Sequence, residues 1–146
     1  MLNTKMKISP SLARLNFDRF QKFQDRPSSN VLTQAIYTFK GDTYVGLDAN
    51  SFSKKDIDYA QKHLRILSGL YGLVSPLDLI QPYRLEMGTK FPCGESKNLY
   101  DFWNKNITEQ LHRSLKKEKV LINCASNEYF KSVDTKMLKG VKIITP

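Results

Sequence analysis

The sequence predicts a mixed α/β fold of the α+β kind, with a small sheet flanked by helices. Apolar residues recur at helical spacing in three segments, and short runs of β-branched or aromatic residues lie among them. Turn-forming residues separate the two kinds of segment. Helices that alternate with strands are typical of such domains. Because 146 residues are enough to bury one hydrophobic core, we expect a single domain over residues 1–146.

The first predicted helix covers residues 12–23. Its apolar face is formed by Leu12, Leu15, Phe20 and Phe23. A loop over residues 26–30 ends this helix. The run Ala-Ile-Tyr-Thr-Phe at residues 35–39 is of strand type, and residues 40–42 form a tight turn.

A second helix is predicted over residues 54–67. Ser53 is a suitable N-cap, and Asp56 completes an arrangement close to a capping box. Gly69 is placed to close the helix in the left-handed conformation. Since Ser75-Pro76 can start a helix, a short one should follow over residues 76–80.

The C-terminal third is predicted to contain a long helix, two strands and a short helix. Ser96 caps the long helix, and Lys116 to Lys119 close it. Its apolar stripe is Leu99, Trp103, Ile107, Leu111 and Leu115. Residues 120–124 form a buried strand, 128–133 a short helix and 141–145 another strand.

The net charge is +9, from 23 basic and 14 acidic residues, and it is spread along the chain. Such an excess suits nucleic acid or another polyanion, and equally a solubilising surface. Cys93 and Cys124 are not in a metal-binding pattern, so we expect reduced thiols, with Cys124 in the core and Cys93 more reactive. No apolar run suits a membrane span or a signal peptide, so we expect a cytoplasmic protein without membrane contact.

The segment after the second predicted helix can be interpreted as a helix-hairpin-helix. There a glycine-containing hairpin and the next helix N-terminus offer backbone N–H groups to a DNA phosphate. The candidate DNA-binding residues are Lys62, Arg65, Ser68, Gly69, Leu70, Tyr71 and Gly72. The spacing is imperfect, because two residues separate the glycines and the helix restarts late. A purely structural turn explains the same glycines.

A second candidate site takes residues from two turns. Its members are Lys40, Asp42, Tyr83, Arg84 and Glu86. Arg84 can bind an anion through two N–H groups, although a plain ion pair with Glu86 explains the same residues. The turn Asn123 to Tyr129 also follows a predicted strand, where ligands often bind in α/β folds. Such a cleft would suit an enzyme or a protein that binds a small anionic ligand.

Established catalytic and metal motifs are missing from the sequence. Ser126 has no nucleophile elbow around it, and His63 and His112 lie on predicted helices as surface or packing residues. We therefore expect no catalytic residue, no metal site and no cofactor. Iron binding through Asp and Glu stays open as a third interpretation, without a clustered set of ligands.

Several longer words resemble the YaaA peroxide stress family of bacterial proteins. They are Phe39-Lys-Gly-Asp42, Leu67-Ser-Gly-Leu-Tyr-Gly72, Pro76-Leu-Asp78, Gln81-Pro-Tyr-Arg-Leu-Glu-Met-Gly88, Ala125-Ser126 and Glu128-Tyr-Phe-Lys131. The resemblance implies protection against hydrogen peroxide by limiting iron-mediated damage. It also implies DNA binding in a basic cleft with a helix-hairpin-helix, where the hairpin maps to residues 67–72.

The same resemblance implies a longer protein. Family members open with a strand and an Ile-Ser-Pro-Ala-Lys word, of which Ile8-Ser-Pro10 is a partial match. They also continue beyond a position equivalent to Pro146. We therefore expect residues 1–146 to be a central fragment, and the complete protein to be a monomer.

Overall fold

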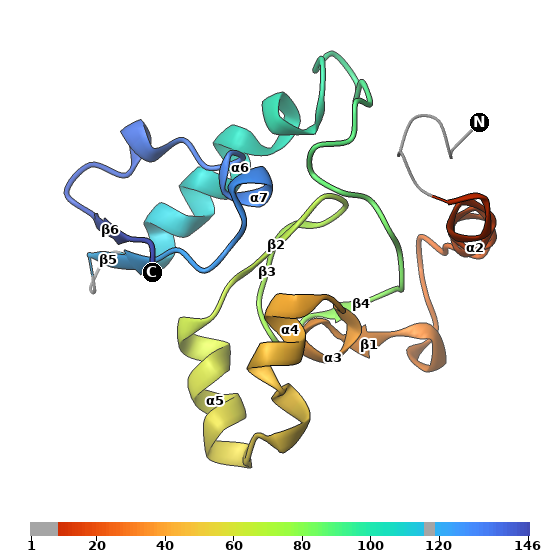
Figure 1. Cartoon of the computed structure of the whole chain (residues 1–146), viewed down its shortest axis with the longest axis horizontal. Coiled ribbons are helices and arrows are strands. Elements are labelled where there is room, and N and C mark those ends of the chain that lie inside the picture. Colours follow the sequence, from red (N-terminus) through yellow and green to blue (C-terminus); the bar gives the residue numbers. More distant parts are fainter. Residues whose placement is uncertain (1–8, 116–118) are drawn as a thin grey trace. The chain divides into compact units, whose positions relative to one another are not determined.

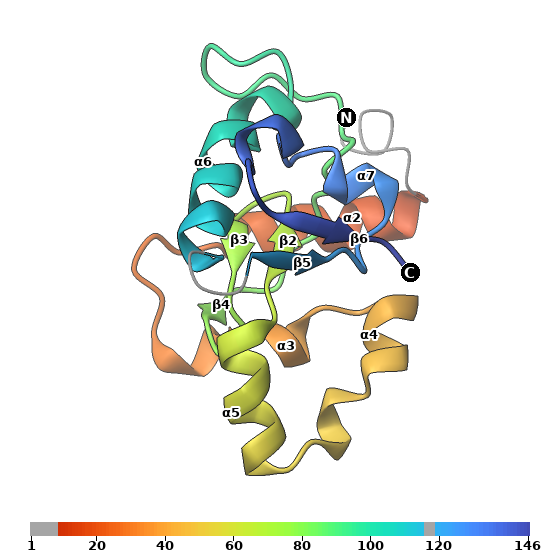
Figure 2. The same cartoon turned by 90° about the vertical axis from the view of Figure 1, so that its left-hand side faces the viewer.

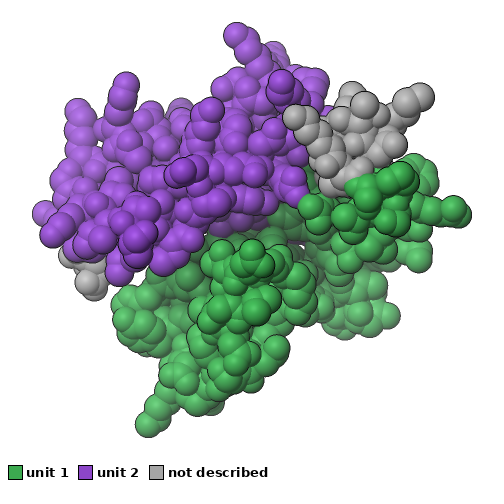
Figure 3. Space-filling view, viewed as in Figure 1, with its two compact units in different colours: residues 1–66, 74–85 green, residues 67–73, 86–146 purple. Residues whose placement is uncertain are grey.

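The computed structural model describes residues 9–115 and 119–146, and it confirms a fold of mixed helices and strands. The chain divides into two compact units, which are coloured separately in Figure 3. Unit 1 contains residues 1–66 and 74–85, and unit 2 contains residues 67–73 and 86–146. The single domain expected from chain length stays a prediction.

The first described helix of unit 1 is α2, Pro10–Gln21, which confirms a helix here but not its predicted apolar face (Figure 1). Leu12 and Leu15 are exposed, and the buried residue of α2 is Asn16. The hydroxyl of Ser9 accepts a hydrogen bond from the backbone N–H of Leu12, and proline occupies the first turn. A short 3₁₀ helix, η1, follows at Ser29–Val31. It lies where the sequence predicted a loop.

The strand predicted over residues 35–39 is wrong, because Ala35–Thr38 forms the single-turn helix α3. Strand β1, Thr33–Gln34, comes just before it and pairs antiparallel with β4, Leu79–Ile80. The N–H groups of Ala35 and Ile36 donate to the carbonyls of Asp78 and Pro76 at 2.8 and 2.9 Å. These long-range bonds satisfy the first turn of α3, so tertiary contacts override the local strand propensity.

Helix α5, Lys54–His63, starts as predicted but ends four residues early. Ser53 and Asp56 form a complete capping box. Leu64 then adopts an extended conformation, and Ile66 enters strand β2. Between α3 and α5 lie α4, Asp42–Leu47, and the 3₁₀ helix η2, Ala49–Ser51.

The helices of unit 1 share a small apolar core. Ile36, Ala49 and Ala60 are buried at its centre, one each from α3, η2 and α5. The partly buried residues packed around them are Tyr37, Leu47, Phe52, Ile57 and Leu64.

Strands β2, Ile66–Ser68, and β3, Gly72–Val74, pair with each other across the turn at residues 69–71. The helix expected over residues 76–80 is absent. The Asp78 carboxylate instead accepts the Ser75 N–H at 2.7 Å, and the Asp78 N–H returns to the Ser75 carbonyl at 3.1 Å. This local turn leads directly into β4.

Unit 2 is organised around helix α6, Leu99–Ser114, whose buried residues include Leu99, Ile107 and Leu111, as predicted. Its N-cap is Asn98 and not Ser96, which forms an isolated bridge with Cys93. The hydroxyl of the buried Thr108 donates to the Asn104 carbonyl and accepts the Asp134 N–H at 2.9 Å. That bond ties α6 to the chain before the 3₁₀ helix η3, Thr135–Met137.

The remaining elements of unit 2 are β5, Val120–Ile122, α7, Asn127–Phe130, and β6, Lys142–Ile144. Strands β5 and β6 pair in parallel and lie side by side in Figure 2. Both strands were predicted, but β5 was expected to be buried and is largely exposed. Of the segment Lys116 to Lys119, predicted to close this helix, residues 116–118 lie outside the described part of the chain. No described helix is long and apolar enough to cross a membrane.

Candidate functional site

The segment Leu67–Gly72 is the tip of a β-hairpin, so the helix-hairpin-helix geometry expected for it is wrong. The element that follows β3 is a turn and not a helix. Ser68, Gly69 and Gly72 are buried, and Leu70 and Tyr71 are half-buried. The Tyr71 N–H donates to the Ser68 hydroxyl at 2.9 Å.

Trp103 of α6 covers this hairpin tip within unit 2. Its indole Nε1–H donates to the Gly69 carbonyl at 2.9 Å. Gly72 has a φ of 77°, and a Cβ placed there would lie 2.6 Å from Cζ3 of the Trp103 ring. Gly72 therefore has a packing reason that the sequence did not reveal.

The two basic residues assigned to the hairpin lie in unit 1, at and after the end of α5. Lys62 is exposed. The Arg65 guanidinium donates from Nη1 to the carbonyls of Gln61, Lys62 and Leu64, at 3.1, 3.4 and 2.7 Å. Arg65 thus caps the helix C-terminus, where carbonyls lack helical partners.

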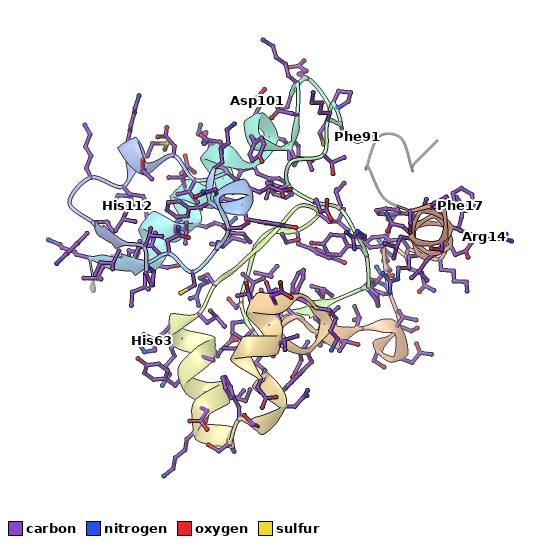
Figure 4. All side chains as sticks on the ribbon, viewed as in Figure 1. Arg14, Phe17, His63, Phe91, Asp101 and His112 are labelled. Carbon is purple, nitrogen blue, oxygen red and sulfur yellow. The ribbon has the colours of Figure 1, made fainter. Side chains whose placement is uncertain are left out.

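The exposed face of α5 carries a stacked pair of aromatic side chains. Tyr59 and His63, one turn apart, stack with ring centroids 4.2 Å apart. Figure 4 labels His63 on the side of α5 away from α3 and α4. Both histidines are exposed on helices, as predicted.

Of the residues predicted for the cleft, Tyr83 contacts an aromatic cluster centred on Phe39 in unit 1. The Phe39 ring stacks on Tyr44 at 5.5 Å and meets Tyr83 edge-on at 6.1 Å. Burial, and then the charge of the nearby Tyr83, raise the pKa of Tyr44 to about 12. Lys40 and Asp42, on the turn between Phe39 and Tyr44, are both exposed.

Buried amides hold the chain next to Tyr83. The Asn16 side chain donates to the Arg84 carbonyl at 2.7 Å and accepts the Arg84 N–H at 3.0 Å. The Gln81 side chain bonds the backbone of Gln24 in the same two-way manner, at 3.0 and 2.9 Å. Arg84 is therefore positioned through its main chain by α2. Glu86, the last predicted cleft residue, is half-buried in unit 2.

A polar cluster of unit 2 joins Glu128, from the predicted Asn123–Tyr129 turn, to residues that sequence reasoning did not assign to it. The exposed Glu128 accepts the Gly88 N–H at 2.8 Å, and a Cβ at residue 88 would lie 2.9 Å from the same oxygen. Burial, and then Glu128, raise the pKa of Tyr100. The Lys131 ammonium lies 5.3 Å from the Tyr100 ring centroid. The segments Met87-Gly88 and Glu128 to Lys131 are therefore in contact within unit 2. A single sequence does not show which distant segments come into contact.

A basic exposed stretch of the described chain covers residues 131–142, which we call the lysine-rich segment. Its exposed lysines are Lys131, Lys136, Lys139 and Lys142. Asp134 is its one carboxylate, and that side chain is half-buried and accepts the Lys136 N–H at 3.0 Å. The exposed Lys119 joins this surface, because its carbonyl accepts the Lys142 N–H at 2.8 Å.

The two cysteines and the possible metal ligands do not form a candidate site among the described residues. Cys124 is exposed and Cys93 half-buried, both as free thiols, so the core position expected for Cys124 is wrong. Ser126 precedes α7 as its N-cap residue. Among residues 9–115 and 119–146 there is no group of three or more His, Cys, Asp or Glu side chains that could hold a metal.

These features define a mixed α/β protein with a lysine-rich surface on one of its two units. A model of the peroxide stress protein YaaA family matches residues 1–146, and the chain belongs to this family. The resemblance read from the sequence words is therefore confirmed.

Individual relatives are similar along nearly all of this chain. A UPF0246 protein of Acaryochloris marina is 52% identical over 139 residues, which is 95% of this chain and 55% of the relative. A UPF0246 protein of Burkholderia pseudomallei is 52% identical over 149 residues, which is 99% of this chain and 57% of the relative. The chain thus spans a little over half the length of these curated relatives.

Proposed function

We propose that this chain contributes to peroxide stress resistance by binding DNA through its lysine-rich segment, without reading base sequence. The supporting observation is the charge on residues 131–142. This segment has four exposed lysines and a single carboxylate, which is half-buried and hydrogen-bonded. Lysine ammonium groups neutralise phosphates and release counterions, which is the main source of affinity in non-specific binding. DNA covered in this way would be shielded from oxidants that iron generates from peroxide.

The lysine-rich segment is a better candidate than the hairpin tip that the sequence favoured. Ser68, Gly69 and Gly72 are buried, and the Gly69 carbonyl is occupied by Trp103. Lys62 stays exposed, but Asp56 and Asp58 share its helix. The local excess of positive charge is therefore smaller on α5 than on residues 131–142.

The test measures binding of a labelled random-sequence DNA duplex by fluorescence anisotropy. The variant Lys136→Glu/Lys139→Glu should weaken binding by about tenfold or more, because it reverses two phosphate contacts. The matched control Lys55→Glu/Lys62→Glu makes the same charge change on α5 and should weaken binding less than about threefold. Equal losses in the two variants would refute the assignment to the lysine-rich segment, and a wild-type chain that does not bind would refute DNA binding.

A separate experiment tests whether the chain protects DNA from oxidative damage. It measures the nicking of plasmid DNA by Fe²⁺ and hydrogen peroxide. The wild-type chain should reduce nicking, and Lys136→Glu/Lys139→Glu should lose most of that effect. If both proteins protect equally, protection does not act through DNA covered by this segment.

A second candidate function, binding of a small anionic aromatic ligand, is favoured by one observation in unit 1. The Phe39, Tyr44 and Tyr83 rings lie together, next in sequence to Lys40 and Arg84. Stacking and a cation suit a nucleotide, so ATP is the probe. Calorimetry should show binding that Tyr83→Ala removes and Tyr59→Ala does not. Unchanged binding in Tyr83→Ala would reject this site.

A further inference from the structure

Helix α6 holds the lysine-rich segment through one buried hydroxyl. The side chain of Thr108 is 0% exposed, and its hydroxyl acts both as a donor and as an acceptor. It donates to the Asn104 carbonyl at 2.6 Å and accepts the Asp134 N–H at 2.9 Å. The first bond orients the hydroxyl on its own helix, so that a lone pair is directed to Asp134. Thr108 therefore ties residue 134 to α6 in the interior of unit 2.

Local bonds carry this order from Asp134 to the lysines that follow it. The Asp134 carboxylate accepts the Lys136 N–H, and its carbonyl accepts the Met137 N–H, both at 3.0 Å. Leu138 is buried, so the chain is anchored again between Lys136 and Lys139. The 3₁₀ helix η3 formed in this way contacts α6, and the chain between α7 and β6 passes beside α6 in Figure 2. A displacement of Asp134 would therefore move both lysines.

The lysine-rich segment is also held near its two ends. The Lys131 ammonium lies 5.3 Å from the ring centroid of Tyr100, which is on α6 as well. The Lys142 N–H donates to the Lys119 carbonyl at 2.8 Å. The exposed lysines thus stand on a backbone that is fixed at three places. Ordering a free loop on binding costs free energy, and a surface that is ordered beforehand avoids this cost.

We propose that Thr108 is a positioning residue for DNA binding, because it fixes the arrangement of Lys136 and Lys139 before DNA binds. This inference rests on the proposed binding of DNA by the lysine-rich segment. Thr108 is buried and uncharged, so it acts through Asp134 and not by contact with a phosphate. Thr108→Val replaces the hydroxyl by a methyl group and leaves the Asp134 N–H without this partner. All lysines, and the charge of the chain, stay unchanged.

The test compares Thr108→Val with Thr108→Ser, which keeps the hydroxyl, by anisotropy on a random-sequence DNA duplex. Thr108→Val should weaken binding by about three- to tenfold, since one hydrogen bond and the order that it imposes are lost. Its slope of log affinity against log salt concentration should equal that of wild type, because every lysine remains. Thr108→Ser should bind like wild type, although the missing methyl group leaves a cavity that destabilises the fold.

Ser114→Ala is the matched control on the same helix. The Ser114 hydroxyl also donates to a carbonyl one turn earlier, that of Gln110 at 2.9 Å, but Ser114 is exposed. This variant should bind like wild type. If Thr108→Val binds DNA as tightly as wild type, the positioning role is overturned and the proposed function stands. Equal losses in Thr108→Val and Thr108→Ser would overturn it in favour of a general loss of stability.

Amide hydrogen exchange without DNA separates failure of this inference from failure of the proposed function. Exchange at residues 134–138 should be faster in Thr108→Val than in wild type and unchanged in Thr108→Ser. Unchanged exchange in Thr108→Val would overturn the role of Thr108, whatever the chain binds. A wild-type chain that binds no DNA would refute the proposed function and the positioning role together. Faster exchange in Thr108→Val would then show that Thr108 holds the segment for another reason.

Discussion

At the scale of single residues, unit 1 is organised by buried polar side chains. Asn16 satisfies both the N–H and the carbonyl of Arg84, and Gln81 does the same for Gln24. Asn16 and Gln81 are buried, so loss of either amide would leave main-chain groups without these partners. This explains why α2 directs the polar Asn16 inward while the apolar Leu15 and Phe17 are exposed.

The raised pKa of the Tyr44 phenol leads us to expect that the free energy of unfolding falls at high pH. Its pKa is raised from the usual 10.0 to about 12, chiefly by burial. Because the folded state holds this proton more tightly, its contribution to stability is complete below pH 10. It is lost as pH rises from 10 to about 12, and amounts to about 2 kcal/mol. Tyr44→Phe should therefore lose less unfolding free energy than wild type over this interval.

The measurement is urea unfolding at several pH values between 8 and 12. Tyr59→Phe is the control, because Tyr59 is a large exposed aromatic of the same unit. Its stability curve should run parallel to that of wild type. A parallel curve for Tyr44→Phe as well would show that burial of this phenol does not affect folding.

At the scale of elements, the β2–β3 hairpin and α6 form one structural arrangement. The hairpin turn presents the Gly69 carbonyl to the Trp103 indole, and Gly72 leaves room for the ring. A helix continued to residue 67 would remove strand β2 from this pairing. Gly72 thus serves the turn between the two strands and the close contact with the Trp103 ring.

Gly72→Ala should destabilise the protein by about 2–4 kcal/mol. A positive φ costs alanine about 1 kcal/mol, and overpacking against the Trp103 ring adds about 1–3 kcal/mol. Gly46→Ala is the matched control, since nothing lies within 4 Å of its Cβ position and it sits inside α4. That change should be neutral or stabilising by up to about 1 kcal/mol.

Fluorescence of Trp103, the one tryptophan of the chain, can follow unfolding in urea. It reports directly on the residue that Gly72 contacts. If Gly72→Ala unfolds at the same urea concentration as wild type, the close contact between Gly72 and Trp103 does not exist in solution.

Elements with strong local signals were predictable from sequence. The apolar stripe of α6 and the capping box of α5 are periodic or local patterns, and both are confirmed. Segment 35–39 was mistaken for a strand because its helical turn depends on carbonyls more than 35 residues away. Lys40 and Tyr83 were chosen from separate turns, but the contact of Tyr83 with the Phe39 ring was not anticipated. Tertiary partners of this kind leave no trace in one sequence.

At the scale of the whole molecule, positive charge alone does not locate a binding surface. Unit 1 has 12 basic and 7 acidic residues, and unit 2 has 11 and 7. The totals are almost equal, so the units differ chiefly in how charges are arranged. In unit 1, Arg65 caps a helix and Lys62 shares α5 with two aspartates. In unit 2, the lysine-rich segment carries four exposed lysines and one carboxylate within residues 131–142.

Salt dependence of DNA binding can separate a local surface from diffuse attraction. Each phosphate neutralised contributes about −0.9 to the slope of log affinity against log salt concentration. If the lysine-rich segment makes the contacts, Lys136→Ala/Lys139→Ala should make the slope shallower by about 2. Lys55→Ala/Lys62→Ala should leave the slope unchanged, although it removes the same charge from the molecule. Anisotropy titrations at salt concentrations between about 50 and 200 mM give these slopes. Equal reductions in both variants would mean that the net charge of +9, and not the arrangement of residues 131–142, governs the attraction.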